Sequence, residues 1–272
     1  MAIAVVETLT NTSGNNSSLT INTGDFTPNP GVGDLLVSHF VYGSTGATIT
    51  LPSGWTQIIK TENAGDAITS QLAYKVADSS DASGQSLTWD KGAGNVVIKI
   101  FVTRITGQKT VSVIAASSGQ ANDSTTTVTA PTVTPSDADS LIMFFTATDG
   151  SGSISGYSLA TSSPTFTEQY DSTANNYGAS MAYGIRPEVT ATGSGTATDT
   201  DTGNNIGQLV VVSSPQSATL TDTVTATDET RYNIGGLYTD SISLSESNTF
   251  TEKSWFNQDK NNSTWDNQEK SE

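Results

Sequence analysis

Short apolar or alternating runs of five to ten residues recur along the first 213 residues and are separated by Gly, Asn, Asp, Ser and Pro. Such runs predict β-strands joined by turns, because Thr, Val and Ile fit a pleated sheet and Gly, Asn and Asp supply turn conformations. No helix of any length is predicted. Within the first 104 residues the expected strands lie at 3–8, 18–22, 34–42, 47–50, 55–62, 68–76, 86–89 and 95–104. So many strands within about a hundred residues favour an antiparallel sandwich of immunoglobulin-like or jelly-roll type.

The strand pattern occurs twice. Residues 3–104 correspond to residues 111–212, with IAVV matching VSVI at the start and an Ala-Tyr pair in register near the middle. A correspondence of this length indicates an internal duplication. We therefore expect an all-β protein with two β-sandwich repeats, 1–107 and 108–213, which are either tandem domains or pseudo-twofold-related halves that share one core.

Beyond the second repeat the pattern changes. LTDTVTATD at 220–228 is echoed by YTDSISLSE at 238–246, and alternating aliphatic and hydroxyl side chains predict a half-buried strand in each. A lone hairpin is marginal in water, so this one is expected to add to a neighbouring sheet in this chain or another. The sequence thus predicts a hairpin extension over 214–252 and an extended tail over 253–272.

The tail carries the pattern Trp-x-Asn-Gln-acid-Lys twice, ten residues apart. In a helix this spacing would leave the two tryptophans about 80° apart around the axis, whereas in a strand they share one face about 33 Å apart. The repeat favours an extended peptide that docks on a partner through two aromatic anchors; the alternative is a frayed terminus. The predicted assembly contacts are Trp255, Asn257, Gln258, Trp265, Asn267 and Gln268.

Composition restricts the classes of partner. With 27 acidic and 11 basic residues the formal net charge is -16, and a negative surface repels nucleic-acid backbones and anionic membranes. The chain has no cysteine, which excludes disulfides, thiolate metal sites and thiol nucleophiles. No run approaches the ~20 apolar residues of a membrane span, and the N-terminus lacks the basic start of a secretory signal. We expect no nucleic-acid partner and no membrane insertion, in a protein made in a cytoplasm.

Candidate catalytic and metal-binding groups are few. The single histidine, His39, lies in the apolar run LLVSHFVY without a G-x-S-x-G motif, which favours a satisfied structural histidine over a Ser-His-Asp arrangement. Paired carboxylates for glycoside cleavage are disfavoured because the acids lie mostly in turns. DTDTGNN at 199–205 has the spacing of a calcium loop, but Val210 stands where the bidentate acid belongs, which favours a turn before a strand. We expect no catalytic residue, metal or cofactor.

Exposed aromatic side chains would mark a glycan-binding surface. Trp55 and Trp89 lie in predicted strands, and Trp55 corresponds to Phe166 of the second copy, which predicts a core position for Trp55. The loop-rich stretch 148–178 is the more plausible place for recognition. Its candidate receptor-facing residues are Tyr157, Tyr170 and Tyr177.

The runs NPGVGDLLVSHFV, LPSGWTQI, SQLAYKVADSS and LTWDKGAGNVVIKIFV resemble a repeat-containing β domain of virion proteins from tailed bacteriophages and related viruses. The Thr/Ser-Asp stretch with its Trp-x-Asn-Gln tandem also resembles the C-terminal region of phage structural proteins. The resemblance names no catalytic residue. It implies a trimeric component exposed on capsid or tail and anchored to other virion proteins through its C-terminal region.

The leading hypothesis is therefore a non-enzymatic virion structural protein, of capsid decoration or tail-fibre type. Two alternatives stay open. One is a receptor-binding adhesin that recognises host surface glycans, and the other is a glycan-degrading enzyme.

Overall fold

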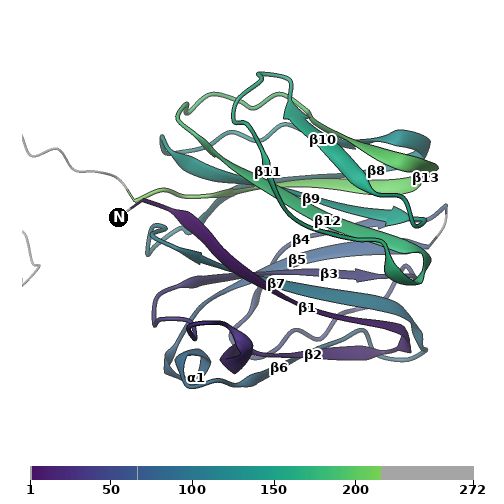
Figure 1. Ribbon diagram of the computed structural model, residues 1–272, viewed down its shortest axis with the longest axis horizontal. Coiled ribbons are helices and arrows are strands. Elements are labelled where there is room, and N and C mark those ends of the chain that lie inside the picture. Colours follow the sequence, from purple (N-terminus) through teal and green to yellow (C-terminus); the bar gives the residue numbers. More distant parts are fainter. Residues whose placement is uncertain (1, 66, 216–272) are drawn as a thin grey trace, which may run out of the picture. The chain divides into compact units, whose positions relative to one another are not determined.

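The apolar and alternating runs of the sequence fold into β-strands, which make up nearly all of the regular structure (Figure 1). The computed structural model describes residues 2–65 and 67–215. Within them the strands form two large sheets and a two-stranded ribbon, and the strand pairs are antiparallel. The predicted all-β class is confirmed. The predicted hairpin strands at 220–228 and 238–246 and the predicted tail lie outside the described residues.

The first sheet comes from the first half of the chain and has the order β1-β7-β3-β5-β4. Its strands are β1 (Ala4–Asn16), β7 (Val96–Thr106), β3 (Leu35–Tyr42), β5 (Ile68–Val76) and β4 (Thr56–Asn63). The strand predicted at 47–50 is reduced to a single bridge between Thr50 and Asp90. The helical segments of this half are the short η1 (Thr23–Asp25) and the four-residue α1 (Ser79–Ala82).

A ribbon made of β2 (Ser18–Asn22) and β6 (Ser86–Asp90) covers the outer face of the first sheet. Trp89 of β6 is fully buried there and lies edge-on to Trp55, with the ring centroids 5.0 Å apart. Both indoles pack against Phe40 of β3 in one apolar cluster. The core position predicted for Trp55 is therefore confirmed.

The second sheet comes from the second half of the chain and has the order β10-β13-β9-β12-β11, with β8 paired to β13. Its strands are β8 (Ile114–Ala130), β9 (Ser140–Asp149), β10 (Ile154–Leu159), β11 (Thr167–Ser172), β12 (Tyr177–Arg186) and β13 (Gly195–Val212). The short η2 (Ala174–Asn176) joins β11 to β12. The path β8-β13-β9-β12-β11 has the order that a duplication of the first sheet predicts.

β8 and β13 are long because each bends back over its own sheet. Their shared ladder shifts register between Thr198 and Asn205, and the outer halves then pack on the sheet's outer face. A Cβ added to Gly207 of inner β13 would lie 2.5 Å from the carbonyl oxygen of Thr129 in outer β8, so only glycine permits this approach. These outer halves cover the second sheet as the ribbon covers the first.

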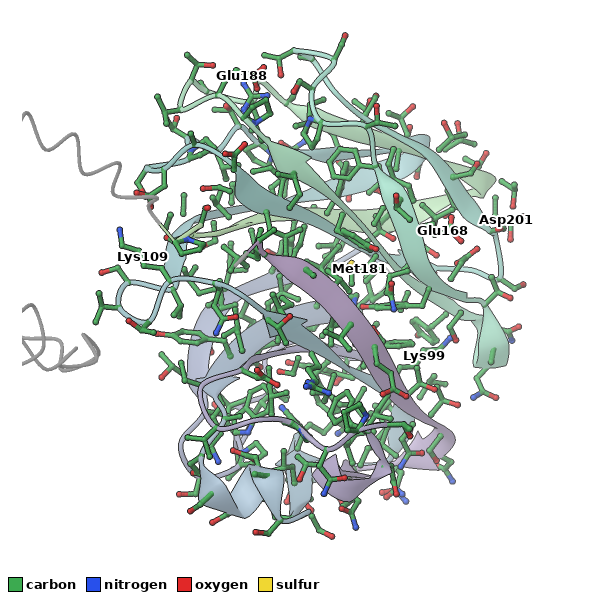
Figure 2. The ribbon with its side chains drawn as sticks, turned by 60° about the vertical axis from the view of Figure 1, so that its left-hand side comes forward. Lys99, Lys109, Glu168, Met181, Glu188 and Asp201 are labelled. Carbon is green, nitrogen blue, oxygen red and sulfur yellow. The ribbon has the colours of Figure 1, made fainter. Side chains whose placement is uncertain are left out.

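The two large sheets face each other and share one apolar core. It is built from Leu35, Val37, Leu72 and Ile105 of the first sheet and Leu141, Met143, Phe145, Met181, Val210 and Val212 of the second. Figure 2 shows Met181 between the two layers. The described residues 2–65 and 67–215 thus belong to one compact unit.

β3 and β9 carry continuous apolar runs because both of their faces are buried. In β3, Leu36 and Phe40 pack toward the ribbon, whereas Leu35 and Val37 pack toward the second sheet. Successive side chains of β3 therefore point to opposite faces of the sheet, although every residue of the strand is buried. β9 is arranged in the same way.

The body has two unlike ends. At one end the chain enters the fold, since Ala4 pairs with Thr106, and the described chain leaves it, since Val212 pairs with Ile114. We call this end the terminal pole; it lies at the side of the N label in Figure 1. The opposite end, where β3 and β9 finish, is the distal pole.

Candidate functional site

A chain of buried polar side chains crosses the core from sheet to sheet. The Nδ1 of His39 in β3 lies 2.8 Å from the hydroxyl of Tyr170 in β11, and its Nε2 lies 2.9 Å from Oγ of Ser70 in β5. Ser70 Oγ donates to Oε1 of Gln208 in β13 over 2.6 Å. Gln208 Nε2 donates to Oγ1 of Thr61 in β4 over 2.9 Å. The network thus joins five strands and both sheets.

The directions of these hydrogen bonds decide what the Ser70–His39 pair can do. Gln208 Nε2 also donates to the Ser70 carbonyl, which can only accept, so the amide orientation is fixed. The Ser70 proton therefore goes to Gln208, and Ser70 Oγ accepts from His39 Nε2. Tyr170 then donates to Nδ1. In a nucleophilic serine the hydroxyl donates to the histidine, so this pair has the opposite polarity.

Lys99 of β7 lies beside this network and has a smaller effect than burial on the pKa of His39. Its Nζ donates to the carbonyl oxygen of Ser172 over 2.9 Å and to its Oγ over 3.1 Å. Burial lowers the pKa of Lys99 to about 8, although nearby Asp171 opposes this shift. Burial, with a smaller effect of Lys99, lowers the pKa of His39 to about 3. His39 is therefore neutral at neutral pH, as its hydrogen bonds require.

The protein is expected to lose stability on mild acidification through His39. Its pKa is about 3 in the folded protein and 6.5 for an unperturbed histidine, so below pH 6.5 the unfolded chain binds a proton that the folded chain excludes. This linkage removes about 2 kcal/mol at pH 5 and acts between pH 6.5 and pH 3. Denaturant unfolding of wild type and His39→Gln at pH 7 and pH 5 measures it. The variant should lack the wild-type loss over this interval, and an equal loss in both proteins would refute the assignment.

The three candidate tyrosines do not lie in loops, so the loop assignment of their stretch is wrong. Tyr157 lies in β10, edge-on to Phe144, and its hydroxyl bonds to Ser180. Tyr170 lies in β11 and stacks on Phe101 with the centroids 4.1 Å apart. Tyr177 begins β12. All three are half-buried, and the rings of Tyr157 and Tyr170 are used for packing.

The stretch DTDTGNN lies within β13, so the turn predicted for it is wrong as well. Asp199 is buried, and its Oδ1 accepts the backbone N–H of Asp201 over 2.9 Å. Burial is the main cause that raises the pKa of Asp199. Within residues 2–65 and 67–215 no group of three or more His, Cys, Asp or Glu side chains is placed to hold a metal.

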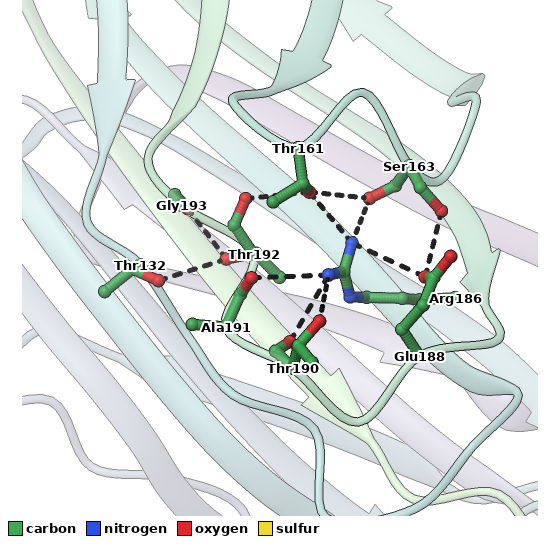
Figure 3. A network of polar contacts seen from close by, with 9 residues as sticks. All are labelled: Thr132, Thr161, Ser163, Arg186, Glu188, Thr190, Ala191, Thr192 and Gly193. Carbon is green, nitrogen blue, oxygen red and sulfur yellow. Dashed lines mark hydrogen bonds and ion pairs between the residues drawn. The ribbon is translucent and has the colours of Figure 1, made fainter.

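At the terminal pole a buried arginine ties together two loops of the second sheet (Figure 3). Arg186 ends β12 and is 1% exposed. Its guanidinium donates to Thr161 Oγ1 over 2.9 Å, to the Ser163 carbonyl, and to Thr190 Oγ1 over 3.1 Å. Glu188 completes an ion pair at 3.7 Å. The loops before β11 and after β12 are thus held by one side chain.

The basic residues of residues 2–215 are used inside the fold. Each one donates to a carboxylate, a carbonyl or a hydroxyl of the same chain. They are Lys60, Lys75, Lys91, Lys99, Arg104, Lys109 and Arg186. A phosphate backbone would have to displace these internal partners to bind them. Within the described part of the chain, no helix is long and apolar enough to cross a membrane.

Sequence reasoning missed Ser70, Gln208 and Arg186. The available signal was a polar residue at an inward-facing position of an otherwise apolar strand, as in ITSQLAYKV and NNIGQLVVV. That signal cannot name the partner, because Ser70 and Gln208 lie 138 residues apart. The predicted assembly residues in the tail, including Trp255 and Trp265, lie outside the described residues.

Comparisons of the chain with protein-family models, with curated proteins and with solved structures gave no match.

Proposed function

We propose that the protein is a non-enzymatic structural component of a tailed-virus particle, of capsid decoration or fibre type. In this proposal the β body is exposed on the particle and residues 214–272 attach it to other virion proteins. The supporting observation is that the chain enters the body and leaves it at one pole. A module connected to its particle at one end can present the other end to the surroundings.

The buried network supports the same role. Placing three buried and two half-buried polar side chains between two sheets stabilises little by itself, but a satisfied network fixes one alignment of the sheets. The Ser70–His39 pair takes part in that alignment and has the opposite polarity to a nucleophilic pair. A rigid body with one alignment suits a component that is assembled many times in the same form.

The test is incorporation into particles. Deleting residues 247–272 is expected to leave the cooperative unfolding of the body unchanged and to abolish its presence in purified virions. The double variant Trp255→Ala, Trp265→Ala should do the same, whereas Trp255→Phe, Trp265→Phe retains both aromatic anchors and should be incorporated. Incorporation of the truncated chain at the wild-type level would exclude the proposed attachment.

A receptor-binding adhesin is the second candidate, and amide side chains at the distal pole favour it. Asn15, Asn16, Asn95, Asn175 and Asn176 are all exposed there. Two contacts bring their segments together: Asn16 pairs with Val96, and Asn175 lies 3.4 Å from a Cβ placed on Gly14. Amides can both donate to and accept from sugar hydroxyls. Selective binding on a glycan array that is lost in Asn175→Ala would favour the adhesin; no selective binding would favour a plain structural component.

A further inference from the structure

The exposed large hydrophobic side chains of the body gather at the terminal pole. Singly exposed hydrophobic residues are ordinary on a protein surface, but here those within residues 2–65 and 67–215 lie at or near one end. They are Val6, Val32, Val76, Val111, Ile185 and Val189. Val32 and Val111 are 71% and 68% exposed. Their loops are joined, since Gln108 Nε2 donates to the Gly33 carbonyl over 2.6 Å.

Several of the charges next to these side chains are paired within the chain. Val32 precedes Asp34, which binds Arg104 over 2.7 Å, and Val76 lies between Lys75 and Asp78, which bind each other over 2.9 Å. Val111 follows Lys109, whose partner is Asp137 at 3.4 Å, and Val189 follows Glu188, whose partner is Arg186. Glu7 and Asp139 add negative charge at this end. The ion pairs therefore compensate only part of the charge near the apolar side chains, because Lys75 is shared by Asp78 and Asp81 and the chain has a formal net charge of -16.

The ends of the two sheets that meet at the terminal pole correspond to each other. β3 and β9 both run from the terminal to the distal pole, and the edge strand β4 faces β8, as shown by the bond of Asn63 Nδ2 to the Asn122 carbonyl. At the other edge β1 approaches η2, where Gly14 lies against Asn175. The two sheets are thus related by an approximate twofold axis that runs along the strands. Val76 and Ile185 occupy matching positions, because each lies the same distance along the chain after the Ala-Tyr pair of its repeat, which ends at Tyr74 and Tyr183 respectively.

We propose that the terminal pole is the contact between two copies of this chain. A twofold contact uses the same patch on both partners, and a pole that is itself built from two equivalent halves is suited to meet its own copy. Internal ion pairs occupy the bases of this pole, so in this proposal burial of the exposed apolar side chains drives the contact. This inference does not depend on the proposed function.

Sedimentation equilibrium of the full chain tests this contact. The wild-type protein is expected to have a molecular mass of twice 28.3 kDa. The double variant Val32→Asp, Val111→Asp is expected to have the mass of one chain. The matched control, Thr48→Asp, Asn95→Asp, adds the same charge at exposed positions of the distal pole and should remain dimeric. Thermal unfolding of both variants, compared at one concentration, shows whether each body is folded.

A dimer that dissociates in the pole variant and persists in the control, with both folded, supports the inference. It is overturned by a wild-type monomer at tens of micromolar, by a trimer, or by a dimer that both variants retain. Particle incorporation is measured separately, so the proposed virion role can fail while the dimer stands, and the reverse.

Discussion

Replacing Arg186 with methionine is expected to lower the free energy of unfolding by about 3 kcal/mol or more. Methionine fills much of the space of the arginine stem but donates no hydrogen bond. The Thr161 hydroxyl, the Ser163 carbonyl and the Thr190 hydroxyl then lose a charged donor, although Thr161 and Thr190 are themselves exposed residues. Urea unfolding followed by tryptophan fluorescence measures the loss.

The matched control for Arg186→Met is Lys60→Met, which removes a base from a more exposed ion pair. The Lys60 and Glu62 side chains are 25% and 34% exposed and lie 2.6 Å apart. Pairs of this kind contribute about 0–1 kcal/mol, because water screens them. Equal losses in the two variants would show that the loops at the terminal pole do not depend on the Arg186 network.

Replacing Trp89 with alanine is expected to cost about 3–5 kcal/mol, the range for a large aromatic side chain removed from a core. Trp89 is 0% exposed, and its ring is at 74° to that of Trp55. The cavity opens between the ribbon and the first sheet, where β2 and β6 are held by only one ladder. Thermal unfolding should show a lower transition temperature, with the ribbon as the weakest part.

Two comparisons separate the packing of Trp89 from the strand that carries it. Trp89→Phe keeps an aromatic ring against Trp55 and should cost clearly less than Trp89→Ala. Thr88→Ala changes the preceding residue, which is exposed and whose hydroxyl bonds to the Thr20 hydroxyl on the surface. The free energy of unfolding is expected to fall by about 0.5 kcal/mol. If Thr88→Ala were as damaging as Trp89→Ala, the loss would come from strand pairing and not from the core.

The proposed dimer differs from the trimer that the resemblance to virion proteins implies. The trimer rests on the resemblance alone, whereas the dimer rests on exposed apolar side chains, paired charges and an approximate twofold axis within the body. The mass of the full chain in solution therefore distinguishes a property of this chain from a property of the proteins it resembles.

The sequence by itself determined the strands that are buried on one or both faces. The run predicted at 34–42 forms β3 at Leu35–Tyr42, and the run predicted at 68–76 forms β5 with those bounds. These predictions succeed because apolar content and alternation are local, and burial acts on each residue separately. The loop prediction for the stretch 148–178 fails for the converse reason. β10 and β11 are short edge strands that lack an apolar pattern, since β10 is rich in Ser and β11 consists mostly of polar residues, and backbone pairing holds them.

Tertiary structure alone decided which polar residues meet. His39 reaches Tyr170 across 131 positions of the chain, and no local pattern marks either residue as the other's partner. The fold-back of β8 and β13 was equally hidden, because a bent strand has the same composition as a straight strand followed by a turn. The first feature arises when the two sheets pack face to face, and the second when the outer halves of β8 and β13 pack on their own sheet. Only then must a buried donor find an acceptor, and only then do distant loops come together at one pole.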